Sequence, residues 1–348
     1  MNWWQKLKTN HLAQFGAVVL ILLYVVAIGA GFFAPYDPYV SQPNGSLLPP
    51  TQVYLRHQQT GEWIGPHVYP TTQGPVSLET GERELTVDFS QPSDIRILHR
   101  DDSGQLHLFD TAGAGKWNIL GTDEQARDQF SRLIHGSRVS LFVGLIGIAI
   151  SFPLGMLVGG MAGYFGGAID AVLMRFVEVL MTIPSIYLLV ALAGVLPPGL
   201  TSAQRFMLII LITSLIGWAG LARVIRGQVL SIKEQEFVQA SRVMGGQAFY
   251  IITRHVLPQT ATYGIIAATL AIPSFILAEA VLSFIGLGIQ QPDASWGNML
   301  SISTNASILV LQPWLVWPPA ILIVVTSLAF NLLGDGLRDA LDPRTLKQ

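Results

Sequence analysis

Residues 139–169 read VSLFVGLIGIAISFPLGMLVGGMAGYFGGAI, without one Lys, Arg, Asp, Glu or His. A helix needs about 20 mainly apolar residues to cross a bilayer, so this stretch is long enough to span one. Similar charge-free runs recur along the chain, and all are too long for the strands of a membrane barrel. We therefore predict an all-α polytopic membrane protein with six transmembrane helices. Their expected ranges are about 13–34, 139–160, 172–195, 206–224, 260–286 and 313–333.

The composition supports the same class of protein. Of the 348 residues, 51% are hydrophobic and 12% are charged, whereas soluble domains carry about 25% charged residues. The net charge of −2 argues against a nucleic-acid binder, which needs a basic surface. The absence of Cys excludes disulfides, thiolate metal sites and thiol nucleophiles.

The distribution of charge predicts the orientation. Short cytoplasmic loops of membrane proteins are enriched in Lys and Arg, and long loops are exempt from this rule. With the N-terminus inside, the short inner segments carry most of the basic residues outside 40–138. Both termini are then cytoplasmic. The predicted organisation is a first helix in 1–35, an external periplasmic segment in 36–138, and a five-helix core in 139–348 with a cytoplasmic loop at 225–258.

The external segment is expected to contain a small β-rich insert between the first two helices. Residues 84–89, 95–99 and 106–110 alternate apolar and polar side chains, the pattern of a half-buried strand. Gly, Pro, Ser and Asp separate these stretches and favour turns. A loosely ordered loop is the alternative. The insert would dock a partner or cap an outer gate, or it is a tolerated expansion of a loop.

The loop between the fourth and fifth predicted helices has a distinctive pattern. Residues 233–258 read KEQEFVQASRVMGGQAFYIITRHVLP. Gly245 and Gly246 would end a short helix, because Gly tolerates the left-handed conformation beyond a helix C-terminus. A second short helix then leads to Pro258 and the next span, which predicts a rigid knob at the cytoplasmic face. Four residues of the first helix follow helical spacing: Phe237, Val238, Ser241 and Met244.

This segment resembles the EAA loop of ABC-transporter permeases, whose pattern is E-A-A-x3-G-x9-I-x-L-P. The triplet corresponds to Gln239-Ala240-Ser241, the glycine to Gly245, and the final pair to Leu257-Pro258. Gln239 replaces the Glu of the pattern, and His255 replaces the Ile. The stretches EFVQASRVMG and RHVLP are similar to the variant of this loop in the dipeptide/oligopeptide/nickel group.

Further blocks resemble the same group. Residues 120–141 read LGTDEQARDQFSRLIHGSRVSL, similar to its LGTDxxGRDxxSRLIxGxRxSL, with Ala126 in place of the usual Gly. The resemblance covers residues 1–40 and 120–348. It indicates the C-type permease of a binding-protein-dependent peptide importer. The remaining matching blocks are EAVLSFIGLG at 279–288, SWGNML at 295–300 and FNLLGDGLRDALDPR at 330–344.

The resemblance implies the fold of type I ABC importer permeases and a set of partners. A homologous second permease, two ATP-binding subunits and an extracytoplasmic substrate-binding protein would join the chain in the lipid bilayer of a bacterial inner membrane. The chain would then be no enzyme and hold no cofactor, because the ATPase subunits would bind ATP and Mg. In agreement, the sole Gly-Lys pair, Gly115-Lys116, lacks the other residues of a P-loop.

Two groups of candidate functional residues follow from the resemblance. The residues expected to couple to the ATPase are Glu236, Ala240, Ser241, Arg242, Gly245, Leu257 and Pro258. The family-motif residues expected on the external side or near the gate are Gly121, Thr122, Asp123, Arg127, Asp128, Ser131 and Arg132. No metal site is expected.

Glu279 lies inside an apolar run, where a charged residue usually faces the bundle interior or a cavity. It would either meet a peptide amine in the pathway, form a structural hydrogen bond, or lie near the external gate.

Two other classes of protein stay open. A secondary transporter would need ion-coupling charges inside its helices and usually inverted repeats, and the predicted helices are poor in charge. An intramembrane hydrolase would need a nucleophile and a base at membrane depth, and no predicted helix contains His. The sequence also lacks H-E-x-x-H and G-x-S-x-G. The motifs do not choose among dipeptides, oligopeptides, nickel chelates and microcin-like peptides as cargo.

Overall fold

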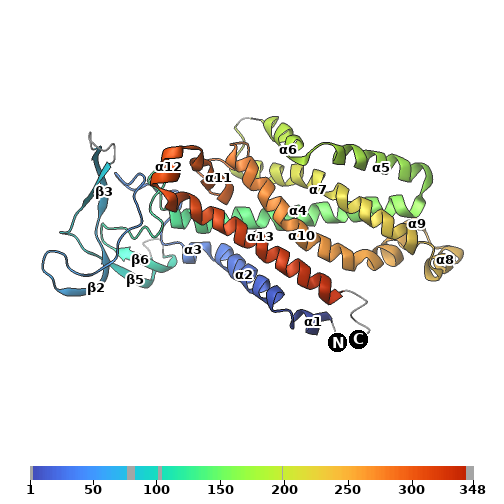
Figure 1. The fold of residues 1–348 in the computed structure, drawn as a ribbon, viewed down its shortest axis with the longest axis horizontal. Coiled ribbons are helices and arrows are strands. Elements are labelled where there is room, and N and C mark those ends of the chain that lie inside the picture. The colour runs from blue at the N-terminus through green and yellow to red at the C-terminus, as the bar shows by residue number, and fades with distance from the viewer. Residues whose placement is uncertain (1–2, 77–82, 101–103, 198, 342–348) are drawn as a thin grey trace. The chain divides into compact units, whose positions relative to one another are not determined.

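The computed structural model describes residues 3–76, 83–100, 104–197 and 199–341. Most of these residues are helical, and the strands all lie between α3 (Ala30–Phe33) and α4 (Gln129–Phe165) in the chain (Figure 1). The chain packs as two compact units. The first unit comprises Met1–Ile21, Phe142–Leu282 and Val325–Gln348, and the second comprises Leu22–Leu141 and Ser283–Val324.

Among the described residues, five helices are long and apolar enough to cross a membrane, or six spans if one bent pair of helices counts as a single span. The prediction of a helical membrane protein is therefore confirmed. The five are α2 (His11–Ile28), α4, α7 (Ser202–Ile232), the helix from α9 (Ala248–Ile251) through α10 (Leu257–Phe284), and α13 (Pro313–Leu341). Shorter helices are α1 (Trp3–Leu7), α11 (Trp296–Leu300), a 3₁₀ turn at Ser301–Thr304 and α12 (Ala306–Leu311).

The bent pair replaces the third predicted helix, 172–195. The chain here forms α5 (Gly167–Thr182) and α6 (Ser185–Gly194), which are bent by 86° to each other. Ile183 at the break is extended, with φ −83° and ψ 124°. A proline disfavours the helical conformation of the residue before it, so Pro184 is the cause of the break. The predicted range 172–195 is therefore interrupted at Pro184, and the pair makes the sixth span only if the bend is counted within one span.

A row of glycines packs α4 against α7 within the first unit. A Cβ added to Gly155, Gly159 or Gly163 would collide with a backbone carbonyl oxygen of α7. Small residues at this four-residue spacing let the two backbones approach closely, as small-xxx-small patterns do in membranes. The carbonyl groups that they approach belong to Trp218, Ala222 and Arg226.

The segment between α7 and α10 forms α8 (Glu236–Val243), α9 and a π-helical turn at Ile252–Val256. We expected Pro258 to separate a short helix from the next span, but α9, the π-helical turn and α10 form one continuous helix. The N–H of Leu257 bonds to the carbonyl of Ile252, five residues earlier. This wider turn makes room for Pro258, which lacks an N–H and would clash with a carbonyl four residues back.

The second unit contains the β-rich insert. A four-stranded antiparallel sheet has the order β1 (Tyr54–Arg56), β2 (Trp63–Val68), β5 (Ser93–Arg100) and β6 (Leu106–Ala112), and α3 packs against β6 (Figure 1). A separate antiparallel pair is formed by β3 (Thr71–Val76) and β4 (Arg83–Val87).

The three predicted strands correspond to β4, β5 and β6, whereas β1, β2 and β3 were not predicted. β2 and β3 each contain a Gly-Pro pair, which in sequence is a turn signal, and β1 is short. The sheet is held by aromatic packing: Tyr69 is 1% exposed, and its ring lies 5.3 Å from that of Tyr54 and 5.1 Å from that of Phe89, between ring centroids.

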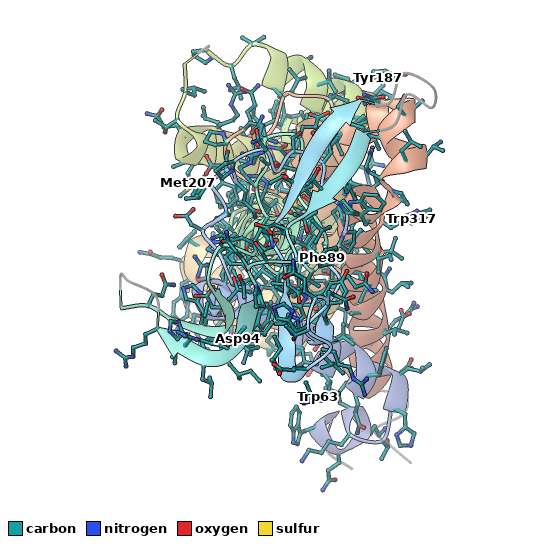
Figure 2. The ribbon with its side chains drawn as sticks, turned by 90° about the vertical axis from the view of Figure 1, so that its left-hand side faces the viewer. Trp63, Phe89, Asp94, Tyr187, Met207 and Trp317 are labelled. Carbon is teal, nitrogen blue, oxygen red and sulfur yellow. The ribbon has the colours of Figure 1, made fainter. Side chains whose placement is uncertain are left out.

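Large apolar side chains are exposed on the outer surface of the apolar helices. Tyr187, Met207 and Trp317 extend away from the helices that carry them (Figure 2) and are 71%, 61% and 60% exposed. Soluble proteins rarely expose large contiguous apolar surfaces. This surface suits the hydrocarbon core of a bilayer.

Candidate functional site

The helix α8 is attached to the first unit by one face. Val238 is 1% exposed and packs in an apolar cluster with Ile225, Val229 and Val256. Glu236 lies in the first turn, where its negative charge suits the positive end of the helix dipole. Figure 1 shows α8 lying beyond the ends of α7 and α9. The segment is thus a short helix whose base is fixed to α7 and to the helix that begins with α9.

The end of α8 is a Schellman motif, as the glycine pair predicted. The N–H of Gly246 bonds to the carbonyl of Ser241 at 3.0 Å, and the N–H of Gly245 bonds to that of Arg242 at 3.1 Å. Gly245 has φ +83°, and its position faces open space among the described residues. A side chain at Gly245 would therefore strain the backbone without colliding with a neighbour.

The predicted coupling residues divide between two sides of this segment. Those with exposed side chains or backbone are Glu236, Ala240, Arg242, Gly245 and Pro258. Ser241 is buried, and Leu257 is half-buried against the apolar cluster around Val238. The first group can meet a partner, whereas Ser241 and Leu257 fix the segment to its base.

An exposed apolar surface adjoins the exposed coupling residues. We call it the coupling patch and define it as Val243, Met244, Phe249 and Tyr250, which are 86%, 80%, 65% and 53% exposed. Of the four residues at helical spacing, Val238 and Ser241 are buried, whereas Phe237 and Met244 are exposed. Exposed apolar patches mark interaction sites. In the sequence, the patch is visible as apolar residues on both sides of Gly245 and Gly246.

Asp123 lies at the centre of a buried ion-pair network in the second unit. Its Oδ2 is 2.5 Å from Nη2 of Arg127 and 3.2 Å from Nε of Arg132. Both guanidinium groups also donate to the carbonyl oxygen of Pro292, at 3.2 and 2.9 Å, and to Oε1 of Gln291, at 2.6 and 2.9 Å. Because the guanidinium groups are committed to protein acceptors, the network has a structural role.

Gly121, Thr122 and Ser131 hold the chain that leads into the insert. Gly121 has φ +68°, and a Cβ here would collide with the carbonyl oxygen of Leu48. The Oγ1 of Thr122 accepts a hydrogen bond from the N–H of Leu48 at 2.8 Å. The Oγ of Ser131 accepts one from the N–H of Tyr36 at 3.2 Å. These motif residues therefore join the start of α4 to the segment after α3.

Asp128 caps α4, which explains why this helix begins at Gln129 and not at the predicted 139. Its Oδ2 accepts a hydrogen bond from the backbone N–H of Ser131 at 2.7 Å. Asp128 is 1% exposed, and its Oδ1 has no hydrogen-bond partner among the described residues. Burial raises the pKa of Asp128 to about 6. Packing alone does not account for this unpaired oxygen.

Glu279 is 0% exposed within α10, so its side chain is enclosed by the protein in this conformation.

A further ion pair joins α5 to α7. Asp170 accepts from Nε and Nη2 of Arg226, at 2.5 Å each. Arg175 and Glu178, also on α5, pair with each other at 3.1 Å on the surface. Arg226 was not predicted, because its partner is distant in the chain.

These features define an integral membrane protein with a helical core and a protruding loop helix. The family described as "Binding-protein-dependent transport system inner membrane component" matches residues 152–347, and "N-terminal TM domain of oligopeptide transport permease C" matches residues 2–50. The chain belongs to the family of binding-protein-dependent transport system inner membrane components. It is therefore a multi-pass inner-membrane component of a transport system, and the resemblance stated from the motifs is confirmed.

Individual relatives extend over most of the chain. The dipeptide transport system permease protein DppC of Bacillus subtilis (strain 168) is 36% identical over 341 residues, which cover 98% of this chain and 84% of that protein. The oligopeptide transport system permease protein OppC of Haemophilus influenzae is 40% identical over 228 residues, covering 66% and 71%. Among solved structures, an amino acid ABC transporter with histidines has a TM-score of 0.43 at 17% identity, covering 62% of this chain and 94% of that one.

Proposed function

We propose that the chain is one permease subunit of an ATP-driven importer of peptides or peptide-like solutes. The relatives named for dipeptide and oligopeptide transport support this substrate class. A homologous second permease would complete the pathway, two ATPase subunits would bind ATP and Mg, and an extracytoplasmic binding protein would deliver cargo. The chain itself would couple and gate, without covalent chemistry.

The observation that carries the proposal is the geometry of α8. Its base is fixed by Val238, while Glu236, Ala240 and Arg242 are exposed beside the coupling patch. This is the form of a helix that inserts into a cleft of another protein. The apolar side chains of the patch would be buried on docking, which favours association by the hydrophobic effect.

The anchoring of α8 suggests how motion reaches the pathway. The cluster around Val238 contains Ile225 and Val229 of α7, and Val256 of the π-helical turn that continues into α10. A displacement of α8 by closing ATPase subunits would therefore move both α7 and α10 instead of being absorbed by a flexible loop. Closure would turn the pathway from inward-facing to outward-facing, and hydrolysis would reset it.

The proposed orientation of the chain in the membrane rests on the distribution of charge. Lys and Arg in the short loops support an orientation with α8 and both termini on the cytoplasmic side and the insert outside. The network of Asp123, Arg127 and Arg132 would then brace the external side of the pathway. Glu279 would act within α10, either as a structural group or opposite a peptide amine during transport.

Gly245→Asp is expected to reduce ATP-dependent peptide uptake by at least about tenfold, because Asp strains a backbone at φ +83° and adds a charge beside the coupling patch. The matched control is Gly61→Asp, at φ +74° and equally open among the described residues, in the turn between β1 and β2. The measurement is purification of the tagged chain in mild detergent, identification of its co-purifying subunits, and their ATPase and uptake activities.

Recovery of a second permease and ATPases, with coupling lost in Gly245→Asp and kept in Gly61→Asp, supports the proposal. Met244→Asp should behave like Gly245→Asp, since it changes the patch without straining the turn. The proposal would be contradicted if the chain purified without partner subunits and neither Gly245→Asp nor Gly61→Asp changed uptake. Uptake that survives ATP depletion would favour a secondary transporter, and proteolysis by the purified chain would favour an intramembrane hydrolase.

The insert is proposed to dock the binding protein or to cap the outer gate. Its ends lie side by side, because Oγ1 of Thr51 donates to the carbonyl of Lys116 at 3.2 Å and the N–H of Thr51 donates to that of Asn118 at 2.9 Å. Residues 50–115 can therefore be replaced by a short linker. We expect the affinity for the binding protein to fall by about tenfold or more, equivalent to roughly 1.4 kcal/mol. Unchanged uptake and docking would make the insert a tolerated loop expansion.

A further inference from the structure

The end of α2 nearest the insert marks the edge of the hydrocarbon core. Leu22, Val25 and Ile28 lie three residues apart and are all exposed, so an apolar stripe of α2 runs to the last residue of the helix. The guanidinium group of Arg138 donates to the carbonyl oxygens of Ala27 and Ile28, at 2.7 and 3.0 Å. A charged group is costly inside hydrocarbon, so the lipid tails end at about this level.

The hairpin of β5 and β6 lies directly beyond this level. The Nδ1 of His107 donates to the carbonyl oxygen of Ala34 at 2.6 Å, and a Cβ added to Gly31 would collide with the side chain of Gln105. Ala34 is six residues beyond Ile28, which is about 9 Å at the rise of a helix. The headgroup region on each side of a bilayer is about 5–8 Å thick. The hairpin therefore lies at the level of the headgroups.

The face of β5 that carries Ile97 is turned toward the membrane helices. Ile97 is directly opposite Phe109 of β6, and opposite residues of an antiparallel pair share a face. The ring of Phe109 lies 5.9 Å from that of Phe130 in α4, between ring centroids. His107 shares this face because successive side chains of a strand alternate. This face of β6 thus packs on the protein, and the same face continues onto β5.

Ile97 and Leu98 are left uncovered by the described part of the chain. They are 75% and 59% exposed. On the other side of β5 from β6, the pairing with β2 involves Ser93 and Asp94. The apolar side chain of Ile97 therefore extends past the helices that β6 packs on, at the level where lipid surrounds them. Contact with lipid would remove its apolar surface from water, which is favourable.

The charge of the hairpin gives it no attraction for an anionic surface. Arg96 and Arg100 are balanced in the sequence by Asp94, Asp101 and Asp102, the last two of which lie outside the described residues. Two cations and three carboxylates leave no net positive charge, whereas attraction to anionic lipid needs a cluster of Lys or Arg. A membrane contact here must therefore depend on burial of apolar side chains.

We propose that Ile97 and Leu98 insert into the headgroup region of the leaflet on the insert side of the membrane. The occupant to which we commit is phospholipid, because the exposed part of β5 continues the apolar stripe of α2 at the adjoining level. A protein partner is the alternative occupant. The contact holds the four-stranded sheet against the bilayer, and it does not depend on the coupling role proposed for α8.

The test places one fluorescent label on the full-length chain in nanodiscs. Because the chain has no Cys, Ile97→Cys and the control Leu85→Cys each take a single nitrobenzoxadiazole group. Leu85 is an exposed residue of β4, which belongs to the other β pair, away from α3 (Figure 1). The quencher is phosphatidylcholine with a nitroxide on its headgroup. We expect it to quench the label at 97 at least about twofold more strongly than the label at 85, since only position 97 lies among the headgroups.

Replacing part of the phosphatidylcholine by phosphatidylglycerol, or adding salt to about 1 M, should leave the quenching at 97 unchanged, because the contact is apolar. Equal quenching at both positions would overturn the proposal, and so would quenching at 97 that requires anionic lipid.

The same measurement on the chain together with its co-purifying subunits separates lipid from protein. Retained quenching at 97 supports the lipid contact in the assembly, whereas its loss would assign this surface to a protein partner and overturn the proposal. The labels lie outside the coupling segment, so failure of this experiment leaves the Gly245→Asp experiment untouched, and the reverse also holds.

Discussion

Asp123→Ala is expected to lower the free energy of unfolding by about 3–5 kcal/mol, the usual cost of breaking a buried ion pair. The substitution leaves the guanidinium groups of Arg127 and Arg132 buried without their carboxylate, at positions that are 2% and 1% exposed. It also removes the acceptor for the N–H of Arg127. The loss would loosen the attachment of the 121–132 segment to Gln291 and Pro292.

Thermal unfolding in mild detergent, followed by tryptophan fluorescence, measures this effect. A loss of this size corresponds to a midpoint lower by roughly 10 °C. Asp94→Ala, an exposed Asp on β5, should stay within about 0.5 kcal/mol of the wild type. Asp123→Asn keeps an acceptor and removes only the charge, so it should fall between the two. If Asp123→Ala were as stable as Asp94→Ala, the network would not brace this unit.

Asp128→Asn is expected to raise the free energy of unfolding near pH 7.5 by up to about 3 kcal/mol. Burial raises the pKa of Asp128 from its ordinary 3.8 to about 6, and each pKa unit corresponds to about 1.4 kcal/mol. The folded state therefore binds this proton more readily, and wild-type stability falls as the pH rises through about 4 to 6. Asn carries no charge and still accepts from the N–H of Ser131.

Measuring the free energy of unfolding of the wild type and of Asp128→Asn over a range of pH tests the direction of this effect. The gain of Asp128→Asn should be near zero below about pH 4, where the carboxyl is protonated in both states, and full above about pH 6. Asp94→Asn, whose side chain is exposed, should show no such gain. A variant that is less stable than the wild type near pH 7.5 would mean that the carboxylate has a stabilising partner.

An Asp128→Asn variant that is more stable than the wild type would show that the buried carboxylate is kept at a cost in stability. Natural proteins retain destabilising groups where a site needs them. Asp128 serves as a helix cap with Oδ2, and its Oδ1 is enclosed without a hydrogen-bond partner among the described residues.

Part of the candidate site could be predicted from the sequence. The glycine pair at 245–246 ends α8 in a left-handed turn because few other residues adopt that conformation without strain. The motif around Asp123 was found as a block, but its role as a buried brace was not. That role depends on Gln291 and Pro292, which are far away in the chain.

Ala126 occupies a position whose residue preference is explained by its backbone conformation. It stands where the related pattern has Gly, and its φ is +62°, in the region that Gly adopts most readily. The sequence shows Ala where the related pattern has Gly, and the positive φ in the structure explains why Gly is usual at this position.

The sequence by itself determined the membrane class, the positions of the long apolar helices and the presence of strands in the insert. These depend on composition and short-range periodicity, which act through the solvent that each face meets. The structure shows which proline breaks its helix, since the chain bends at Pro184 and continues as a helix through Pro258. It also decided the pairing of Asp170 with Arg226 and the unpaired oxygen of Asp128. The reason is that burial and pairing depend on contacts with residues distant in the chain, and a local sequence pattern does not predict those contacts.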